Sequence, residues 1–237
     1  MGRVFEKRKY KMFARYDKMA KAFTRIGKEI AIAVKQSGPD PGGNPRLRAA
    51  IQNAKSVNMP KDRVDAAIKR ASSKDEKDYE EVVYEGYGPN GVAILLECAT
   101  DNPTRTVANV RMYFNRGGGA LGKTGSLDFV FSRKGLFKFD PTGMDLDELE
   151  LELIDFGLED IAVDEENIGY IYTGFQDYGG MQKILEEKGV KLISSELTRV
   201  PLSHAESSSE ESENEILEMV AKMEEDDDVQ NVYHNLK

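Results

Sequence analysis

The chain has 237 residues, 33 of them Lys/Arg and 42 Asp/Glu, which gives a formal net charge of −9. Hydrophobic residues make up 40% of it, enough for packed cores, so wholesale disorder is excluded. The longest apolar runs, such as residues 91–96, are far shorter than the ~20 residues that cross a bilayer. The basic N-terminal stretch lacks the apolar region of a secretory signal, and a single cysteine, Cys98, cannot form an intramolecular disulfide. We therefore expect a cytoplasmic protein of two or three domains.

The charge is divided unevenly along the chain. Residues 1–74 contain 19 Lys/Arg and 6 Asp/Glu, a local charge of +13, and the remaining residues have a charge of −22. Such asymmetry indicates that the basic part contacts a nucleic acid or a membrane surface. The alternative is that the basic segment docks onto the acidic one. The overall charge of −9 therefore does not argue against a nucleic-acid partner.

Residues 18–35 are predicted to form a helix with two different faces. Apolar side chains recur every three or four residues and share one arc of the helical wheel: Met19, Phe23, Ile26, Ile30, Ala33 and Val34. Basic side chains share the opposite arc: Lys18, Lys21, Arg25, Lys28 and Lys35. This pattern predicts one packed face and one exposed cationic stripe.

Two more helices follow a turn-rich break at residues 37–43. Asn44 and Pro45 are a typical N-cap and first helical residue, and a third helix is expected to start at Pro60. The predicted inward residues are Leu47, Ile51, Ala54, Val64, Ala67, Ile68 and Ala71. These two helices add four candidate nucleic-acid-binding residues: Arg46, Arg48, Lys69 and Arg70.

The first residues of the chain mix basic and aromatic side chains. The basic ones are Lys7, Arg8, Lys9, Lys11 and Arg15, and the aromatic ones are Tyr10, Phe13 and Tyr16. This mixture suits an arm that contacts phosphates and stacks on bases. The aromatic residues could equally pack into a small core.

From Tyr79 onward the pattern changes to alternating strands and helices, which indicates α/β layers. Strands are predicted at residues 92–98, 127–131, 135–140, 169–172, 190–200 and 229–233. Helices are predicted from Asn102–Pro103 to the glycines at 117–119, from Asp145 to Gly157, over 178–188, and after a capping box of Ser212 and Glu215. The Asp145 segment also fits strand alternation. The last helix is expected to turn Ile216, Leu217, Val220 and Met223 inward, after a polar linker at residues 203–213.

Two glycine-rich motifs resemble phosphate-binding loops but stand in the wrong context. Gly86, Gly88 and Gly91 match the dinucleotide fingerprint, yet they precede a predicted strand instead of opening a helix. Residues 117–124 (GGGALGKT) match the Walker A pattern, but a predicted helix enters the loop and a strand leaves it. We therefore expect no nucleotide cofactor. The loop remains a candidate functional loop through Gly117, Gly118, Gly119, Gly122 and Lys123.

No arrangement of residues indicates catalysis. His204 and His234 lie outside any triad spacing, and Cys98 ends a predicted buried strand. The acidic clusters at residues 210–215 and 224–228 lack the ligand spacing of a calcium loop. We expect a protein that is not an enzyme and that holds neither a metal nor a cofactor.

Residues 44–71 and the motifs YEGYGP, TDN, RTVA and GGGALGKTGS within residues 84–135 resemble the YebC/PmpR family. The family includes bacterial proteins described as probable transcriptional regulators and the mitochondrial translational activator of cytochrome c oxidase. The resemblance implies a three-domain α+β fold: a basic helical domain (1–76), a middle α/β domain (77–132 plus 204–237) and an inserted α/β domain (133–203). The usual start of the family's main branch, AGHSKWANIKHRK, is replaced here by GRVFEKRKYKMFARYDKMAKAF, as in a side branch.

The function expected from these observations is a non-enzymatic transcriptional regulator that binds DNA through its basic helical domain. The alternative is a ribosome-associated translation factor that contacts ribosomal RNA, since the same +13 segment suits either polyanion. On that alternative the glycine loop would enter a narrow RNA site. Neither a membrane nor a small-molecule substrate is expected as a partner.

Overall fold

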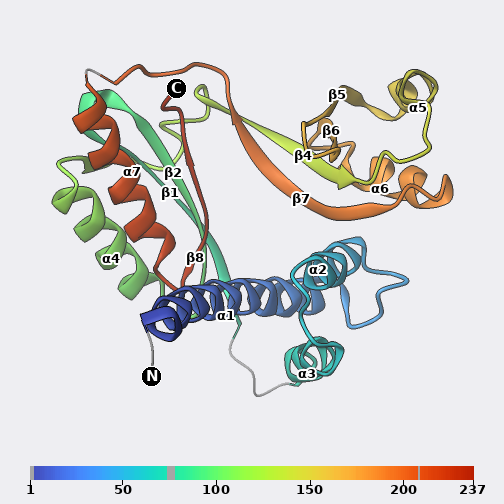
Figure 1. Ribbon diagram of the computed structural model, residues 1–237, viewed down its shortest axis with the longest axis horizontal. Coiled ribbons are helices and arrows are strands. Elements are labelled where there is room, and N and C mark those ends of the chain that lie inside the picture. The colour runs from blue at the N-terminus through green and yellow to red at the C-terminus, as the bar shows by residue number, and fades with distance from the viewer. Residues whose placement is uncertain (1–2, 74–77, 208) are drawn as a thin grey trace. The chain divides into compact units, whose positions relative to one another are not determined.

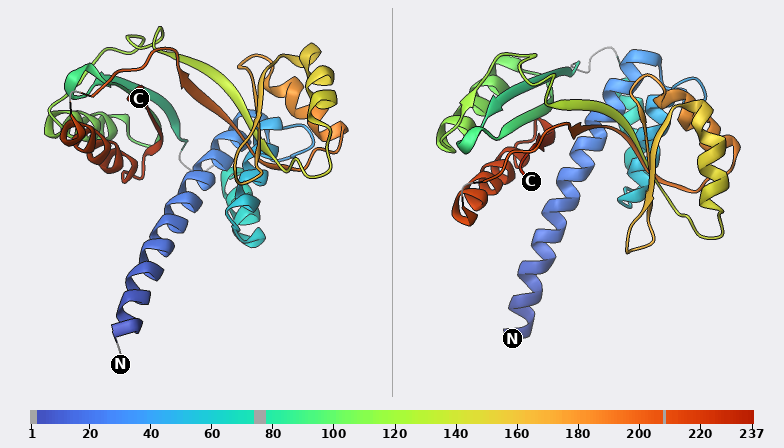
Figure 2. Two further views of the ribbon diagram at one scale, coloured as in Figure 1. Left: turned by 45° about the horizontal axis from the view of Figure 1, so that its top comes forward. Right: turned by 90° about the horizontal axis from the view of Figure 1, so that it is seen from above.

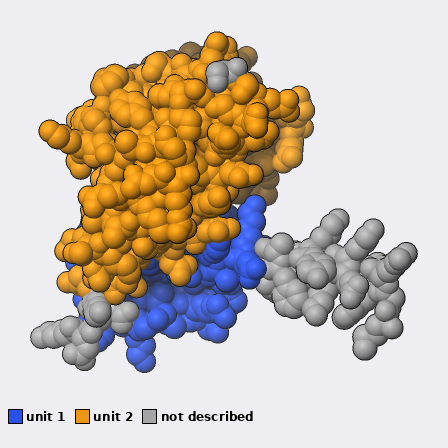
Figure 3. All heavy atoms as spheres, turned by 90° about the vertical axis from the view of Figure 1, so that its left-hand side faces the viewer, with its two compact units in different colours: residues 1–76 blue, residues 77–237 orange. Residues whose placement is uncertain are grey.

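The chain folds into two compact units, residues 1–76 and 77–237 (Figure 3). The computed structural model describes residues 3–73, 78–207 and 209–237, with side chains from residue 17 onward. None of the helices in this described part is long and apolar enough to cross a membrane.

The first unit consists of three helices, α1 (Arg3–Ser37), α2 (Pro45–Ser56) and α3 (Lys61–Ala71) (Figure 1). Their shared core contains Ile30, Ala33, Val34, Leu47, Ala50, Ala54, Val64, Ala67 and Ala71. The apolar faces predicted for α2, for α3 and for the part of α1 from Ile26 onward are thereby confirmed, whereas Met19 and Phe23 are only partly buried and lie outside this core. The first helix is longer than its predicted amphipathic part, because it already begins at Arg3.

Asn44 fixes the turn between the first two helices. Its side-chain Oδ1 accepts a hydrogen bond from Leu47 N at 3.0 Å, as predicted for an N-cap, and Pro45 is the first residue of α2. Its Nδ2 donates to the carbonyl oxygens of Ala33 (2.8 Å) and Gly38 (2.9 Å). One buried amide therefore starts α2 and also satisfies carbonyls at the end of α1.

The second unit contains two four-stranded antiparallel sheets. The first sheet has the strand order β3–β1–β2–β8. Its strands are β1 (Glu80–Tyr87), β2 (Ala93–Thr100), β3 (Ala120–Leu121) and β8 (Val229–His234). The strand β8, at the far end of the chain, pairs with β2, so the sheet joins segments about as distant in sequence as this unit allows.

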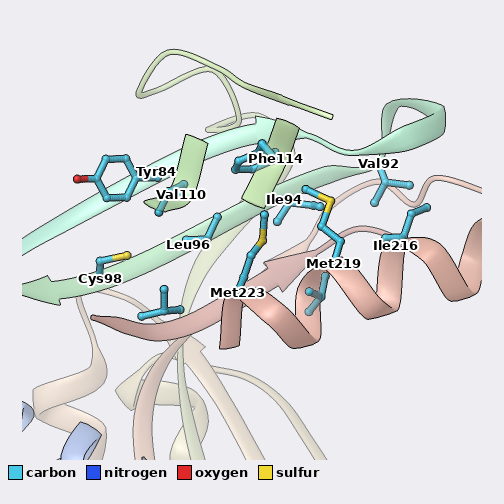
Figure 4. Packing of buried hydrophobic residues seen from close by; sticks show 12 residues of the cluster. Tyr84, Val92, Ile94, Leu96, Cys98, Val110, Phe114, Ile216, Met219 and Met223 are labelled. Carbon is cyan, nitrogen blue, oxygen red and sulfur yellow. The ribbon is translucent and has the colours of Figure 1, made fainter. Parts of the chain in front are cut away.

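Two helices, α4 (Pro103–Arg116) and α7 (Glu210–Glu224), lie side by side on one face of this sheet (Figures 1 and 2). Their core is drawn in Figure 4, where Phe114, Met219 and Met223 pack on Ile94 and Leu96 of β2. Cys98 belongs to the same cluster and is 3% exposed, which confirms it as a core residue.

The opposite face of the first sheet is covered differently along its length. Successive side chains of a strand point to opposite faces, so Ala93 and Leu95 face away from the helices. Leu127, Val130 and Phe131 pack over these two residues.

Farther along that face the contacts are polar. The Glu97 carboxylate accepts from Arg199 Nε at 2.8 Å and from the Tyr233 hydroxyl at 3.3 Å. Burial raises the pKa of Tyr233, and the charge of Glu97 raises it further. The ion pair of Arg199 with Glu97 joins the two sheets.

The second sheet has the strand order β5–β6–β4–β7. Its strands are β4 (Phe131–Phe139), β5 (Leu158–Val163), β6 (Gly169–Gly174) and β7 (Leu192–Pro201). Two helices, α5 (Leu146–Leu153) and α6 (Tyr178–Glu187), pack on it around a core of Phe137, Phe139, Leu149, Leu153, Ile171, Met181 and Leu185. The division of this unit into a middle domain (77–132 plus 204–237) and an inserted domain (133–203) stays a prediction.

The structure resolves the ambiguous Asp145 segment as a helix. Asp145 Oδ1 accepts from Glu148 N at 3.1 Å, as an N-cap does. Leu149 and Leu153, four residues apart, are buried on one side. A short 3-10 turn, η2 (Ile154–Phe156), follows, and Gly157 ends it with a φ of 84°, a conformation that favours glycine.

The predicted strand over Leu127–Phe131 is wrong. Residues 124–130 form a turn in which Val130 N and Phe131 N donate to the carbonyl oxygen of Leu127, and β4 begins at Phe131. The amide of Leu127 donates to the carboxylate of Glu85, so it is not available for a strand ladder. The apolar spacing of Leu127 and Val130 serves to cover the sheet, not to extend it.

Two predictions about the last helix are also wrong. Helix α7 is capped by Ser209 instead of Ser212, because Ser209 Oγ accepts from Ser212 N at 3.2 Å. Leu217 is 42% exposed, whereas Met219 is buried. The buried positions follow the three- and four-residue spacing from Ile216, and Leu217 lies about 100° away from that line.

Candidate nucleic-acid interface

The cationic residues predicted on α1 lie in different environments. Lys18 and Lys35 are exposed, and Lys21 and Arg25 are half-buried. Lys35 Nζ donates to the carbonyl oxygen of Ser73 at 3.4 Å. In the described part of the chain, Lys18 and Lys21 form no ion pair, so their charges are available to a polyanion.

Lys28 does not belong to an exposed stripe. It is 8% exposed, although its helical position places it in the same arc as Lys21 and Arg25. The prediction that Lys28 contributes to an open cationic surface is therefore wrong. Helical periodicity gives the direction of a side chain but does not reveal what covers it.

The two arginines of α2 make contacts within the first unit. Arg46 forms a two-pronged ion pair with Glu29, with distances of 2.7 Å from Nε to Oε1 and 3.1 Å from Nη2 to Oε2. Arg48 Nη1 donates to the carbonyl oxygens of Pro41 (2.9 Å) and Gly42 (3.1 Å). Both side chains fix the α1–α2 turn, which makes them weaker candidates for phosphate contacts.

Helix α3 presents exposed cations on its outer surface. Lys69 and Arg70 are exposed, as predicted, and form no ion pair among the described side chains. Arg63, which was not among the predicted residues, is also exposed, and its Cζ lies 5.6 Å from the ring centroid of Phe23 on α1. Its position seven residues before Arg70 puts both arginines on one side of the helix, and this spacing was the available signal.

The basic residues nearest the N-terminus lie outside the described side chains. These are Lys7, Arg8, Lys9, Lys11 and Arg15, within the first part of α1. Their contribution to nucleic-acid binding stays a prediction from the sequence.

The Walker-like segment is built for close packing. Helix α4 enters it, and it continues through the short strand β3 into the turn at residues 124–130, which is not the strand–loop–helix order of a phosphate cradle. A Cβ atom on Gly119 would lie 2.3 Å from the carbonyl oxygen of Tyr87, and one on Gly117 would lie 2.3 Å from Met219 Sδ. These glycines let β1 and α7 approach the end of α4. Gly118 has a φ of 72° and lies between them.

The part of the loop that carries Lys123 is held by one buried carboxylate. Glu85 on β1 is 3% exposed and accepts from Leu127 N (2.7 Å), Gly125 N (3.0 Å) and Ser126 Oγ (3.2 Å). Gly122 N donates to the Glu85 carbonyl oxygen at 2.7 Å. We call residues 122–127 with Glu85 the latched loop. Lys123 and Thr124 are exposed at its tip.

A second buried carboxylate, which no sequence motif predicted, connects α4 to the turn before β8. Asp228 Oδ2 accepts from Arg105 Nη2 (2.7 Å), Thr106 Oγ1 (2.9 Å) and Thr100 Oγ1 (3.2 Å). Arg105 also pairs with Asp101 at 2.9 Å. The hydrogen bond to Asp228 is the main cause that raises the pKa of Arg105. The TDN and RT motifs of the sequence therefore have a structural role.

Neighbouring groups extend this network. Asp226 Oδ2 accepts from the Tyr113 hydroxyl and from Asn109 Nδ2, both at 3.0 Å. Burial, followed by this hydrogen bond, raises the pKa of Tyr113 to about 12. Across the described residues, no group of three or more His, Cys, Asp and Glu is arranged to hold a metal ion.

The arrangement as a whole defines a class of protein: a basic three-helix unit followed by an α+β unit of two antiparallel sheets, each backed by two helices. Two family models match the chain, the TACO1/YebC protein N-terminal domain over residues 3–74 and the TACO1/YebC second and third domain over residues 79–236. The chain belongs to the TACO1/YebC family.

Individual relatives are similar in sequence to this chain over nearly their full length. A probable transcriptional regulatory protein of Cytophaga hutchinsonii is 61% identical over 236 residues, which cover 100% of this chain and 98% of the relative. One from Myxococcus xanthus is 53% identical and is covered completely, as is this chain. The crystal structure of a conserved hypothetical protein from Aquifex aeolicus has a TM-score of 0.80 at 36% identity, covering 92% of this chain and 90% of that one.

Proposed function

We propose that the protein is a non-enzymatic regulatory protein that binds nucleic acid through the cations of its first unit. The observation that carries the proposal is the set of cations without ion-pair partners among the described side chains, on α1 (Lys18, Lys21) and on α3 (Lys69, Arg70). They lie in a segment with a charge of +13. The name of the relatives, probable transcriptional regulatory protein, supports a regulatory role.

The charges on α3 favour phosphate contacts over the reading of bases. A recognition helix contacts base edges with the residues near its N-terminus. Here that end alternates Lys61 and Arg63 with Asp62 and Asp65, all exposed, so it offers a duplex no net positive charge. We therefore expect binding that depends strongly on salt and weakly on sequence.

The first test is charge reversal on the described cations. The triple variant Lys18→Glu, Lys21→Glu, Arg70→Glu should bind a labelled DNA duplex of about 30 base pairs about 100-fold more weakly at moderate salt, because three phosphate contacts are replaced by repulsion. The log–log slope of affinity against salt should fall by about 2–3. Fluorescence anisotropy over a salt series measures both quantities. Lys28 is left unchanged because it is buried.

The matched control applies the same change in formal charge to exposed lysines of the second unit: Lys183→Glu, Lys222→Glu, Lys237→Glu. It should retain its affinity within a few-fold. An equal loss of affinity in both variants would mean that only the net charge matters. Unchanged binding by the first variant would show that the cations of α1 and α3 do not form the contact surface.

The second candidate function is binding of ribosomal RNA by a ribosome-associated translation factor. The lack of net positive charge in the first turn of α3 favours it, because recognition through phosphates and shape suits folded RNA. Crosslinking in cells followed by sequencing of bound DNA and bound RNA separates the two candidates. Enrichment at promoters alone would exclude the ribosomal proposal, and enrichment on ribosomal RNA alone would exclude the DNA proposal.

A further inference from the structure

Helix α5 exposes large apolar side chains on the side opposite its core contacts. Leu149 and Leu153 are buried against the second sheet, as expected for an amphipathic helix. Leu151 on α5 and Ile154, the first residue of η2, lie three residues apart on the outer side and are 71% and 55% exposed. Phe156, in the adjoining turn η2, is 40% exposed. We call the outer side of residues 147–156 the α5 face.

The apolar residues of the α5 face stand in a stretch of sequence whose charged residues are all acidic. Residues 145–160 include eight Asp/Glu and no Lys or Arg. The exposed acidic positions on the helix surface around Leu151 and Ile154 are Asp147, Glu148, Glu150 and Asp155. Among the described side chains these four carboxylates form no ion pair, whereas Glu152, on another side of the helix, pairs with Lys188 at 2.7 Å.

This combination restricts the chemistry of a partner. The carboxylates would repel a nucleic acid or an anionic membrane surface. They would attract a Lys/Arg-rich protein segment, and the apolar pair at helical spacing would accept large apolar side chains from it. Nothing in the fold of the second sheet requires leucine or isoleucine at these two outer positions, since the core is formed by the other side of the helix.

We propose that the α5 face is a docking site for a basic amphipathic protein segment, one that carries large apolar side chains between Lys and Arg residues. The site lies in the acidic second unit and does not depend on the nucleic-acid proposal for the first unit. The apolar pair supplies the contact area, and the carboxylates orient the segment and speed its association.

The probe is a labelled, end-capped synthetic peptide of about 18 residues with leucines at helical spacing on one side and lysines elsewhere, long enough to form a helix. Anisotropy should show saturable binding to the full chain. The double variant Leu151→Ser, Ile154→Ser should bind at least about tenfold more weakly, because both substitutions are at exposed positions and remove the apolar contact without removing a charge. Hydrogen exchange should slow over residues 146–156 in the complex.

The chain offers a matched control. Leu217 on α7 is 42% exposed and has Glu213 and Glu218 near it on the helix, so Leu217→Ser removes an exposed leucine from a second acidic helix. It should leave the affinity unchanged, and a peptide with serines in place of its leucines should bind weakly to all forms. The proposal would be overturned if both peptides bound equally well, or if both variants weakened binding equally. Either result would mean that the peptide binds by charge attraction alone. Sedimentation of the chain alone tests whether the face binds a second copy of the chain. If the chain self-associated and the double variant abolished this, the α5 face would be a self-association surface, and the proposal of a basic partner segment would be overturned.

Discussion

Replacing Glu85 by alanine is expected to destabilise the second unit by about 4 kcal/mol. The Glu85 carboxylate is buried and accepts two backbone N–H groups and one hydroxyl, and hydrogen bonds to a charged group contribute ~1.5–3 kcal/mol each. The variant would leave the amide of Leu127 buried without an acceptor, which costs a further ~1–3 kcal/mol. Part of this loss is offset, because the variant no longer has to bury a carboxylate and so avoids the cost of its desolvation.

Urea denaturation of the full chain, followed by hydrogen exchange in peptides from β1 and the latched loop, measures this effect. Trypsin adds a local readout, because Lys123 is exposed at the tip of the latched loop and cleavage after it should become faster in the variant. Glu80→Ala, at an exposed position of the same strand, should change stability by less than about 0.5 kcal/mol. A Glu85→Ala protein with unchanged exchange and cleavage would show that the loop is held by packing alone.

Asp228→Ala is expected to destabilise the same unit by about 3 kcal/mol through a different connection. Asp228 is the common acceptor for Arg105, Thr106 and Thr100, so its loss separates α4 from the turn that leads into β8. The cost is smaller than for Glu85 because Arg105 is about half exposed and can be solvated by water. Thr106 also retains bonds to Thr100 and Asn102.

Equilibrium unfolding of Asp228→Ala, Asp228→Asn and Glu225→Ala tests this prediction. The asparagine variant keeps an acceptor of the same shape without the charge, so its loss should be about half that of the alanine variant. Glu225 is exposed near the end of α7, and its removal should be nearly neutral. If Asp228→Asn and Asp228→Ala were both neutral, the network would be a consequence of the fold and not one of its supports.

The elements that the sequence failed to assign share one property. Strand β1 contains Glu80, Glu81 and Glu85, β3 has two residues, and β5 has a largely exposed burial pattern. Each is a strand because of its neighbours in a sheet and not because of its own composition. The turn at residues 124–130 shows the opposite case. Its apolar spacing suggests a strand, but the hydrogen bond from Leu127 N to Glu85 prevents it from pairing in a sheet.

The sequence also predicted the candidate interface only in part. Periodicity placed Lys18, Lys21, Lys69 and Arg70 on outer surfaces, where the structure has them fully or partly exposed. It could not separate them from Lys28, which is buried, or from Arg46, which is paired with Glu29. Burial and ion pairing depend on residues many positions away in the sequence, and a helical wheel shows only the residues of one helix.

By itself the sequence determined the local and compositional features of this protein. The charge split at residue 74 is a matter of counting, and the starts of α2, α4 and α5 follow from Asn44, Asn102 and Asp145, whose side chains bond to amides only three residues away. Only the tertiary structure decided that Glu85 and Asp228 are buried acceptors. Their bonds join residues 42 and 123 positions apart, and no periodicity or capping rule extends over such distances. Long-range burial determines which charges stabilise the fold and which remain for a partner.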